Sequence, residues 1–555
     1  MAGRRATRAR SAGNAGFDTD VLIVGAGPTG LTLARELHTL GVAAQIVDRA
    51  PDAVHESRAL AIQARTLELL ARNRLADDLV AAGNPAGTVL LHERGSAATG
   101  RVHAIPLFDS ALGDTRFPFL LLLSQAGTER VLVERLASAG VGIRRGLALA
   151  RLVQDDHGVT ATLESPGVPT RVVRARYVVG CDGAHSMTRR LAGIDFLGRA
   201  FPQRFLLADV EADGLERGRV HVYLAASGPL FLFPLGSPAT WRVIVGLPRS
   251  APAGPVTLPQ VQAAVARHTG EHIRVHHPVW LTEFTVSSRL ADVFRRGRVF
   301  LAGDAAHIHS PAGAQGMNTG IQDAVNLGWK LALVCHGEAS PALLRSYERE
   351  RMPVARSVLA LTDRAFRAAT VQIPVLRTLR AALGPRLAAI VLRSTRVRRA
   401  GFRRIAELGI HYRHGPLSVE GVPSPAGGPR PGDRYPQPGM PQPGARTPAV
   451  EPPAGPVRHP PVFRLLLCGP AALWSAARVR EFSARWGHLV AVEHRPDAPR
   501  SRWSAAPRSG ATSRRKPGTA QYLVRWDGYV GYRAGGTDLA GAAAYLQGLG
   551  ARPRV

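Results

Sequence analysis

The sequence predicts an α/β protein in which a domain of parallel strands and helices is interrupted by an antiparallel sheet and followed by a helical segment and a small α/β module. Three observations support this architecture. Residues 20–48 read as strand, glycine-rich turn, helix and strand. Residues 205–280 read as successive strands joined by glycine or proline turns, and a new strand–helix series begins at Val462, after a proline- and glycine-rich stretch at 423–461. A chain of 555 residues also exceeds one hydrophobic core, so we expect two or three domains.

Composition favours a globular protein and argues against nucleic-acid binding. Hydrophobic residues make up 45% of the chain and charged residues 20%. The 71 basic residues exceed the 41 acidic ones and give a net charge of +30, but only Lys330 and Lys516 are lysines. Such a bias toward arginine along the whole chain differs from a dedicated phosphate-binding patch. Because no nucleic-acid-binding motif accompanies it, we expect no nucleic-acid partner.

Cysteine use and hydropathy favour a protein of the reducing cytoplasm. Cys181, Cys335 and Cys468 lie far apart without CxxC spacing, which argues against a disulfide scaffold or a zinc site. Residues 1–19 are basic, lack the apolar core of a signal peptide and read as a disordered tail. No apolar run approaches the ~18 residues of a membrane span. We therefore expect no metal and no membrane partner.

The first strand–turn–helix unit carries the pattern of a dinucleotide-binding site. Gly25, Gly27 and Gly30 follow directly on the apolar strand 21–24, and Asp48 ends the next strand. The glycines permit a tight turn and close approach to a pyrophosphate, and the acidic residue can accept from a ribose hydroxyl. A lone GxGxxG is a weak signal. Here strand, glycines, helix, strand and acid occur in register, so they predict dinucleotide binding.

A second polar strand end lies much later in the chain. Asp304 follows the apolar run 299–302, and the glycine-rich loop behind it leads into a helix that we expect to begin near Met317 and to end at Gly337. The first turn of a helix has free N–H donors and a positive dipole end. Strand end, loop and helix start therefore predict a corner that accepts an anionic or polarisable group.

A third motif is the pair Asp182-Gly183, which follows the apolar strand expected at 177–180. An Asp-Gly pair is usually only a turn. Its place directly after a strand and before Ser186 and Arg189 makes it a candidate motif close to the nucleotide.

Aromatic residues of the antiparallel sheet are candidates for the wall of a substrate pocket. The expected strands lie at 206–210, 220–224, 230–235 and 241–247. A sheet beside the anion-accepting corner would form one wall of a pocket. Half or more of such side chains ordinarily fill the core instead. The candidates are Tyr223, Phe231, Phe233 and Pro234.

The order of the motifs resembles that of a known enzyme family. GAGPTG at 25–30, GCDGAHS at 180–186 and GDAAHIHSPAGAQGMN at 303–318 resemble the motifs of the FAD-dependent aromatic hydroxylases, which are single-component flavoprotein monooxygenases. The C-terminal module, with LVRWDGYV at 523–530, resembles the branch that contains phenol hydroxylase and the aromatic polyketide hydroxylases. The resemblance implies a Rossmann-like FAD-binding domain with a helical extension at 20–200 and 285–420, a substrate-binding β-sheet domain at 201–284, a linker at 421–461 and a thioredoxin-like domain at 462–555.

The resemblance also implies roles for the residues that match the motifs. Gly25, Gly27 and Gly30 would hold the FAD pyrophosphate. Asp48 would bind the adenosine ribose, where the family more often has Glu, and Asp304 would accept from a ribityl hydroxyl. The other residues implied to bind the cofactor are Arg49, Arg58, Gln125, Asp182, Gly183 and, through backbone N–H groups beside the flavin pyrimidine ring, Gly316, Met317 and Asn318. The residues implied to separate the cofactor from the substrate are Pro311, Gly313 and Ala314.

The implied reaction needs no protein nucleophile, because the cofactor carries the chemistry. NADH or NADPH would reduce FAD, O2 would be captured as a flavin hydroperoxide, and one oxygen atom would pass to an electron-rich ring of a small aromatic substrate. Two enzymatic alternatives use the same flavin intermediate, namely Baeyer–Villiger insertion beside a ketone and inactivation of an aromatic antibiotic. An alternative of another class is a flavin-binding protein without turnover.

Two features depart from the family pattern. A second glycine is common in the loop where this chain has Ala314, which would narrow the space beside the flavin. The module's Cys468-Gly-Pro-Ala471 lacks the second cysteine of a redox CxxC, so dithiol exchange is excluded. We interpret His307 and His309 as structural or loop residues, because two histidines without a carboxylate ligand pattern make a poor metal site.

Overall fold

The computed structural model describes most of the chain, in thirteen ranges. These are residues 16–53, 59–92, 102–106, 112–225, 228–236, 239–247, 254–310, 313–370, 390–391, 393–425, 427–437, 459–496 and 518–554. Most of the expected tail at 1–19, together with Arg58 and Pro311, lies outside them. Within these ranges no helix is both long and apolar enough to cross a membrane.

The first sheet has a parallel centre, as the apolar strand runs predict. Its main order is β17-β18-β11-β1-β2-β8, and β1 pairs in parallel with both β2 and β11. The side chains of Val21, Leu22 and Ile23 are fully buried, because helices and sheet extensions cover both faces. The strands are β1 (Thr19–Val24), β2 (Ala44–Val47), β8 (Ile143–Arg144), β11 (Val168–Gly180), β17 (Arg295–Arg296) and β18 (Val299–Leu301), with β9 (Ala148–Gln154) and β10 (Val159–Ser165) as an antiparallel extension.

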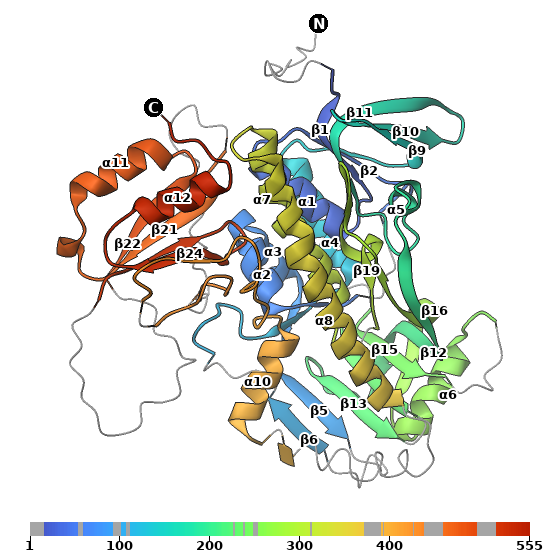
Figure 1. The fold of residues 1–555 in the computed structure, drawn as a ribbon. Coiled ribbons are helices and arrows are strands. Elements are labelled where there is room, and N and C mark those ends of the chain that lie inside the picture. Colours follow the sequence, from blue (N-terminus) through green and yellow to red (C-terminus); the bar gives the residue numbers. More distant parts are fainter. Residues whose placement is uncertain are drawn as a thin grey trace, which may run out of the picture.

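Helices pack on this sheet around α1 (Pro28–Thr39). α1 contacts α4 (Gln125–Ser138) and α7 (Gly316–Cys335). Figure 1 shows α7 and α8 (Arg345–Thr370) as two long helices crossing the molecule in front of α1. The predicted helix end at Gly337 is confirmed, because this glycine follows α7 with φ of +74°. Gly41 follows α1 in the same way, with φ of +72°. The short turns between these elements are η2 (Gly303–Ala305) and η3 (Pro341–Leu344).

The second sheet is larger than the expected range 201–284. Its order is β19-β16-β12-β15-β14-β13-β5-β6. β5 (Thr88–His92) and β6 (Val102–Pro106) lie in the range expected for the FAD-binding domain. They nevertheless belong to the second sheet, because β5 pairs in parallel with β13 and β6 pairs with β5. The domain boundaries therefore differ from the expected ones. The other strands are β12 (Phe196–Asp213), β13 (Val220–Ala225), β14 (Gly228–Pro234), β15 (Trp241–Gly246), β16 (Arg274–Ala291) and β19 (His307–Ile308), and α6 (Leu258–Thr269) packs on one face.

Smaller elements connect the two sheets. A three-stranded sheet has the order β3-β7-β4, with β3 (Ala61–Ile62) antiparallel to β7 (Leu120–Leu122). The remaining elements of the first 420 residues are β4 (Asn84–Ala86), α2 (Ala64–Leu70), η1 (Ala71–Asn73), α3 (Leu75–Ala82), α5 (Met187–Leu191) and α10 (Thr395–Ile405). Most of the helical segment expected between α8 and α10 lies outside the described residues.

The C-terminal module begins before the expected linker ends. Its sheet has the order β20-β24-β23-β21-β22, and β20 belongs to the range that precedes the linker. The N–H of Gly421 donates to Arg533 and that of Gly432 to Val530, each at 2.7 Å. These backbone pairings attach the described part of the expected linker to the module. The elements are β20 (Val419–Glu420), β21 (Phe463–Cys468), η4 (Ala471–Leu473), α11 (Ala476–Trp486), β22 (Val490–Arg495), β23 (Ala520–Val524), β24 (Val530–Gly535) and α12 (Ala540–Gly548).

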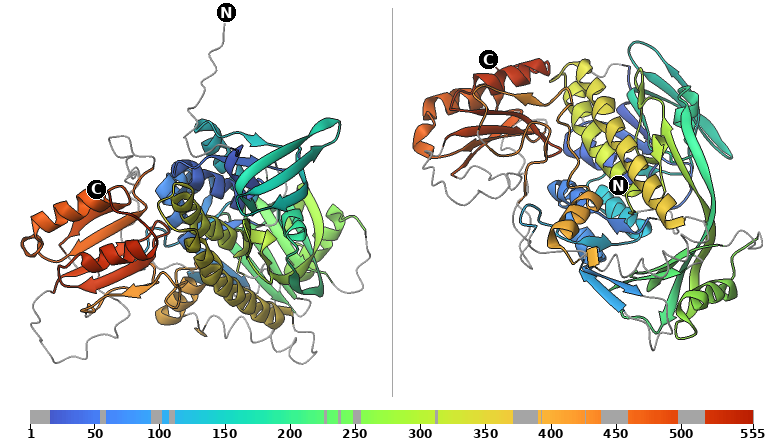
Figure 2. Two further views of the ribbon diagram at one scale, coloured as in Figure 1. Left: turned by 45° about the horizontal axis from the view of Figure 1, so that its top comes forward. Right: turned by 60° about the horizontal axis from the view of Figure 1, so that its bottom comes forward.

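The turn between β23 and β24 docks the module onto α7 and α8. Figures 1 and 2 show the module, coloured orange to red, to one side of these helices. Arg525 donates to both carboxylate oxygens of Glu350 on α8, at 2.6 and 2.9 Å. Lys330 on α7 donates to Glu350 at 2.8 Å, and Asn326 donates to Asp527 at 3.1 Å. Because these side chains are buried, the module is an integral part of the molecule.

Candidate active site

The turn between β1 and α1 has the shape that close approach to a ligand requires. Gly25 has φ of +106°, and a Cβ atom there would lie 2.3 Å from the carbonyl oxygen of Cys181. A Cβ atom at Gly30 would lie 2.0 Å from the carbonyl oxygen of Gly25, whereas one at Gly27 would meet no described atom within 4 Å. The first and third glycines are therefore needed for packing, and the second leaves the turn open on its outer side.

Asp48 closes this turn from the end of β2. Its Oδ2 accepts from the N–H of Ala26 at 2.6 Å, and its Oδ1 accepts from the N–H of Ala50 at 2.8 Å. The carboxylate is half-buried, and each oxygen keeps a second lone pair. Asp48 can therefore accept a further hydroxyl while it holds the turn. Its neighbour Arg49 is exposed.

Helices α1 and α7 both begin without a side-chain cap from the described residues. Gly27 precedes α1 and Gln315 precedes α7, and neither first turn contains an acidic residue. By contrast, Ser124 caps α4 through its hydroxyl. The helix starts can therefore donate to an anion or a carbonyl group. For α7 these donors belong to Gly316, Met317 and Asn318.

The starts of α1, η2 and α7 converge on Thr29. A Cβ atom at Gly303 would lie 2.5 Å from the Thr29 hydroxyl oxygen, and one at Gly320 would lie 2.4 Å from it. Gly303, with φ of +62°, directly precedes Asp304, which is exposed. This packing brings Asp304 to the same end of the parallel sheet as the glycine turn.

Hydrogen bonds to the Asp182 carboxylate hold the turn at Asp182-Gly183. Asp182 accepts from the Ser186 hydroxyl at 2.5 Å and from the Thr188 N–H at 2.9 Å, which fixes the start of α5. Gly183 follows with φ of +77°. Arg189 donates to the carbonyl oxygen of Ala305 in η2 at 2.8 Å. The turn therefore supports both the glycine turn and η2.

Gln125 starts α4 beside the segment that follows the undescribed Arg58. Its backbone N–H donates to Ala59 at 3.0 Å, and its side chain donates to Glu129 at 2.8 Å. Burial raises the pKa of Glu129 to about 7. Arg58 and Pro311, both expected at the site, lie outside the described residues.

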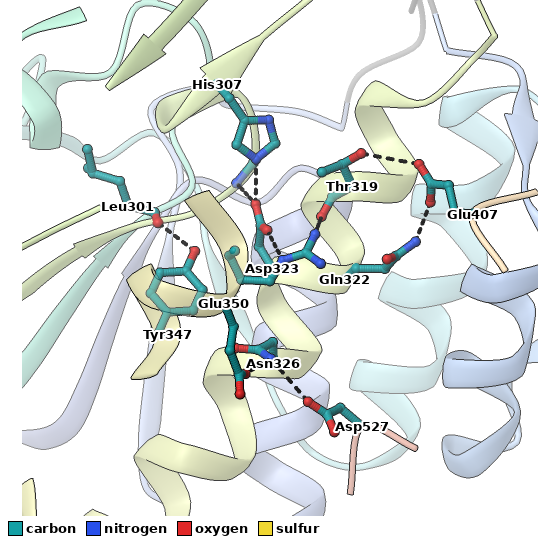
Figure 3. A network of polar contacts seen from close by, with 12 residues as sticks. Leu301, His307, Thr319, Gln322, Asp323, Asn326, Tyr347, Glu350, Glu407 and Asp527 are labelled. Atoms are coloured by element: carbon teal, nitrogen blue, oxygen red, sulfur yellow. Dashed lines mark hydrogen bonds and ion pairs between the residues drawn. The ribbon is translucent and has the colours of Figure 1, made fainter. Parts of the chain in front are cut away.

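A buried polar network beneath the site was not assigned a role from the sequence. Asp323 on α7 accepts from His307 at 2.7 Å, from the N–H of Gly303 at 3.0 Å and from Arg351 at 2.6 Å (Figure 3). Tyr347 donates to the carbonyl oxygen of Leu301 at 2.7 Å. This network fixes β18, η2 and β19 against α7 and α8. His307 is therefore structural, as the sequence predicted.

The signal for this network was present in the sequence as a polar stripe on an otherwise apolar helix. Polar residues recur on α7 at spacings of three and four, which places them on neighbouring turns of one helix. A polar stripe usually faces water, but here α8, Glu407 from the segment after α10, and the C-terminal module contact it. The residues are Thr319, Gln322, Asp323, Asn326 and Lys330, and all five are buried.

Glu407 contacts the first turns of α7 as a buried acid. The Thr319 hydroxyl lies 3.2 Å from Glu407 Oε1 and also donates to the carbonyl oxygen of Gln315 at 2.9 Å. A hydroxyl has one hydrogen, so both contacts are hydrogen bonds only when Glu407 is protonated. Burial raises the pKa of Glu407 to about 8. Gln322 donates to the other carboxyl oxygen (Figure 3).

We expect Glu407→Gln to remove part of the pH dependence of stability. The folded-state pKa of about 8 lies above the ordinary 4.5, so between about pH 4.5 and pH 8 the folded protein binds a proton that the unfolded chain does not. The free energy of unfolding therefore falls as pH rises through this window. In this window the free energy of unfolding of the wild type should fall, relative to the variant, by up to about 1.4 kcal/mol per pH unit. Urea denaturation of both proteins at pH 5, 6.5 and 8 measures this difference. Parallel stability curves would contradict a protonated Glu407.

The face of the second sheet that carries Phe231 and Phe233 lies toward the loop before α7. The two rings stack with centroids 5.9 Å apart. Phe233 and Ala314 pack against the same buried cluster, which contains Leu60 and Leu122. Ala314 has φ of +53°, a left-handed conformation that is uncommon for alanine. The structure thus brings the expected aromatic wall and the expected loop together.

Tyr223 lies on the opposite face of this sheet. On neighbouring strands Val222 pairs with Phe231 and Tyr223 with Leu230, so Tyr223 and Phe231 project to opposite sides. Tyr223 stacks on His92, with ring centroids 4.0 Å apart, and belongs to the core beneath α6. Pro234 is buried and has the same strand parity as Leu230. Tyr223 and Pro234 therefore do not lie on the face of the sheet that carries Phe231, contrary to the expectation for the pocket wall.

Known proteins share this arrangement of sequence and fold. The family model described as "FAD binding domain" matches residues 18–362. The chain belongs to this family. It is 39% identical over 424 residues to 6-methylpretetramide 4-monooxygenase from Streptomyces rimosus, covering 74% of this chain and 73% of that relative.

Solved structures agree with this membership. An anhydrotetracycline hydroxylase from Streptomyces rimosus has a TM-score of 0.70 and 32% identity, covering 97% of this chain and 100% of that one. A flavin-dependent monooxygenase in complex with FAD and substrate has a TM-score of 0.73 and 26% identity, covering 95% and 98%. The chain is an FAD-dependent monooxygenase. The predictions of FAD as cofactor and of NAD(P)H as co-substrate are confirmed at the level of the family.

Proposed function

We propose that this monooxygenase hydroxylates a polycyclic phenolic substrate of the aromatic polyketide kind. The observation that carries this proposal is the apolar face of Phe231 and Phe233, which packs with Ala314 at the loop before α7. Ligand pockets are mostly apolar, and a flat aromatic wall suits a large ring compound. The relatives that act on 6-methylpretetramide and anhydrotetracycline support a substrate of this class.

The residues at the strand ends fit bound FAD. In this proposal the pyrophosphate lies over the turn of Gly25, Gly27 and Gly30, where the close backbone packing leaves no room for a Cβ atom at two positions. Asp48 would bind the adenosine ribose, and Asp304 and Gln125 would bind the ribityl chain. Asp182 with Gly183 keeps the turns after β1 and β11 in place.

Bound FAD supplies the redox chemistry and the activation of O2. The chain contributes a charged and partly water-free environment. The first turn of α7 offers N–H donors and a positive dipole end, which would stabilise negative charge on the pyrimidine ring of bound flavin. The loop from Gly313 to Gly316 would lie between bound flavin and the aromatic wall and would limit the access of water.

Oxidation of NADH and NADPH by the FAD-loaded protein tests the proposal. Candidate polycyclic phenols should stimulate NAD(P)H oxidation above the substrate-free rate, and mass spectrometry should find a product heavier by one oxygen atom. The position of that atom distinguishes ring hydroxylation from insertion beside a ketone. If no aromatic compound raises the rate above background, the proposed substrate class is wrong.

We expect Asp304→Ala to weaken FAD binding by about 1 to 3 kcal/mol, the cost of leaving a buried hydrogen-bonding group without its partner. Flavin fluorescence titration gives the dissociation constant. Asp195→Ala is a matched control, because Asp195 is also an exposed aspartate and lies outside the proposed cofactor site. An unchanged FAD affinity in Asp304→Ala would remove Asp304 from the cofactor site.

The C-terminal module is proposed to have a thioredoxin-like fold without dithiol chemistry. Cys468 ends β21, is fully buried, and has a thiol pKa raised by burial to about 11. Position 471, where a redox motif has its second cysteine, is alanine. A buried neutral thiol without a partner does not exchange disulfides. In this proposal the module supports α7 and α8 through Arg525 and Asp527.

A further inference from the structure

Two side chains that are distant in the sequence, those of Gln63 and Asn318, hold the loop before α7. Gln63, which directly precedes α2, donates from its Nε2 to the carbonyl oxygen of Gly313 at 3.0 Å. Asn318 donates from its Nδ2 to the carbonyl oxygens of Ala314 and Ala61, each at 2.9 Å. The backbone N–H of Gln63 donates to Asn318 Oδ1 at 2.8 Å. The two side chains thus form one clamp around the loop.

The clamp encloses the strained residue of the loop. Ala314 has φ of +53°, and a left-handed conformation costs an L-residue about 1 to 2 kcal/mol. The carbonyl groups of Gly313 and Ala314 accept from Gln63 and Asn318, so hydrogen bonds fix the backbone on both sides of the Ala314 N–Cα bond. A strained backbone persists only where its surroundings hold it, and such sites cluster at ligand clamps.

Gln63 is an unfavourable residue for mere core packing. It is only 1% exposed, and its Oε1 is buried without a hydrogen-bond partner among the described residues. An unpaired buried polar atom destabilises a fold, so an apolar residue of the same volume would pack better at this position. What an apolar side chain lacks is the donor that reaches Gly313.

We propose that Gln63 is a positioning residue that holds the 313–316 loop between flavin and substrate and thereby keeps NAD(P)H oxidation coupled to hydroxylation. This inference rests on the proposed function. In the coupled reaction, aromatic C–H, O2, NAD(P)H and H⁺ give aromatic C–OH, water and NAD(P)⁺. In the uncoupled reaction, O2, NAD(P)H and H⁺ give H2O2 and NAD(P)⁺, and the substrate is unchanged. A loosened loop admits water and misplaces the ring, which favours the second outcome.

Gln63→Met tests the inference, because methionine keeps the volume of glutamine and removes only its hydrogen-bonding groups. The Asn318 bonds to both carbonyl groups and to the N–H of residue 63 remain possible. We expect the ratio of hydroxylated product to NAD(P)H consumed to fall about 2- to 10-fold, the range for one net hydrogen bond, with a matching rise in H2O2. FAD affinity should stay within about 2-fold, because the pyrophosphate site is untouched.

Gln521→Met in the C-terminal module is a matched control. Gln521 is fully buried, donates from its Nε2 to the carbonyl oxygen of Asp538 at 2.6 Å, and also has a buried Oε1 without a described partner. The substitution therefore removes the same kind of hydrogen bond outside the site. Its thermal stability should change in the same direction and by about as much as that of Gln63→Met, while its coupling ratio should equal that of the wild type.

Ala314→Gly in the Gln63→Met background separates positioning from general damage. Glycine adopts the left-handed conformation without the cost that alanine bears, so the loop should return toward its original geometry. We expect the double variant to recover part of the lost coupling. A role of Gln63 in stability alone predicts no such recovery.

The outcomes distinguish this inference from the proposed function. A coupled wild type and an equally coupled Gln63→Met overturn the inference and leave the function intact. A wild type whose NAD(P)H oxidation is raised above the substrate-free rate by none of the aromatic compounds overturns the function itself. If Gln63→Met does not fold, the single variant Ala314→Gly tests the inference. Relief of the backbone strain at residue 314 should raise the coupling ratio or leave it unchanged. A fall in the ratio would contradict the inference that the loop is held in a strained conformation.

Discussion

Replacing Asp323 by alanine should lower the free energy of unfolding by about 3 to 5 kcal/mol, the usual cost of removing one partner from a buried ion pair. Asp323 is fully buried and accepts from Arg351, His307 and the backbone of Gly303. Burial alone would raise its pKa, but the charge of Arg351 and the hydrogen bond from His307 hold the pKa of Asp323 below its ordinary value. Without the carboxylate, the guanidinium of Arg351 stays charged in apolar surroundings.

Urea denaturation of Asp323→Ala measures this loss, and a double variant isolates its cause. Asp323→Ala with Arg351→Met removes both charges and should be more stable than the single variant. The N–H of Gly303 also loses its acceptor, so η2 should loosen and FAD should dissociate faster. If Asp323→Ala lowers the free energy of unfolding by less than about 1 kcal/mol, the Asp323–Arg351 ion pair contributes no more than an exposed salt bridge does. That result would contradict the expected cost of a buried ion pair.

Local features of the cofactor site were predictable from the sequence because short stretches determine them. The turn at Gly25 needs a positive φ, and the helix after Gly316 follows from its apolar periodicity and from Gly337. Asp48 directly follows β2, Asp304 lies in η2 just after β18, and both strands belong to the parallel centre of the first sheet. In each case the signal lies within about twenty residues, which is the range of turn and helix rules.

Features that depend on pairing between distant strands were not predictable. The aromatic candidates appeared to share one wall, but strand register places Tyr223 opposite Leu230 and so turns it away from Phe231. A shift of one residue would reverse that outcome. Likewise, β5 joins the second sheet only because it pairs with β13, more than a hundred residues later. The left-handed backbone of Ala314 was also not predictable, because alanine rarely adopts it.

Arg525→Met should destabilise the protein by about 3 to 5 kcal/mol and separate the unfolding of the C-terminal module from that of the rest. The Arg525 side chain is fully buried and pairs with Glu350 on α8 and with Asp527 in its own turn. Lys330 on α7 completes a cluster of two positive and two negative groups. Loss of Arg525 leaves this cluster with an excess negative charge that buried surroundings disfavour. Calorimetry should resolve two transitions where the wild type has one.

Two variants show whether charge balance or side-chain removal causes this effect. Arg525→Met with Asp527→Asn restores a neutral cluster and should regain part of the stability. Arg495→Met removes another arginine of the module, but its side chain is 53% exposed in its pair with Glu493, so the loss should stay below about 1 kcal/mol. Equal losses in Arg525→Met and Arg495→Met would contradict a docking role for the cluster.

The position of the cluster on α7 connects this result to the cofactor. Asn326 and Lys330 lie ten and fourteen residues after Gly316 on the same helix, whose first turn is proposed to face the flavin. At about 1.5 Å per residue, the docking residues lie only about 15 to 20 Å along the helix from that turn. If the module holds α7 in place, Arg525→Met should weaken FAD binding and Arg495→Met should not. An FAD affinity that is unchanged in both variants would limit the module to a structural attachment.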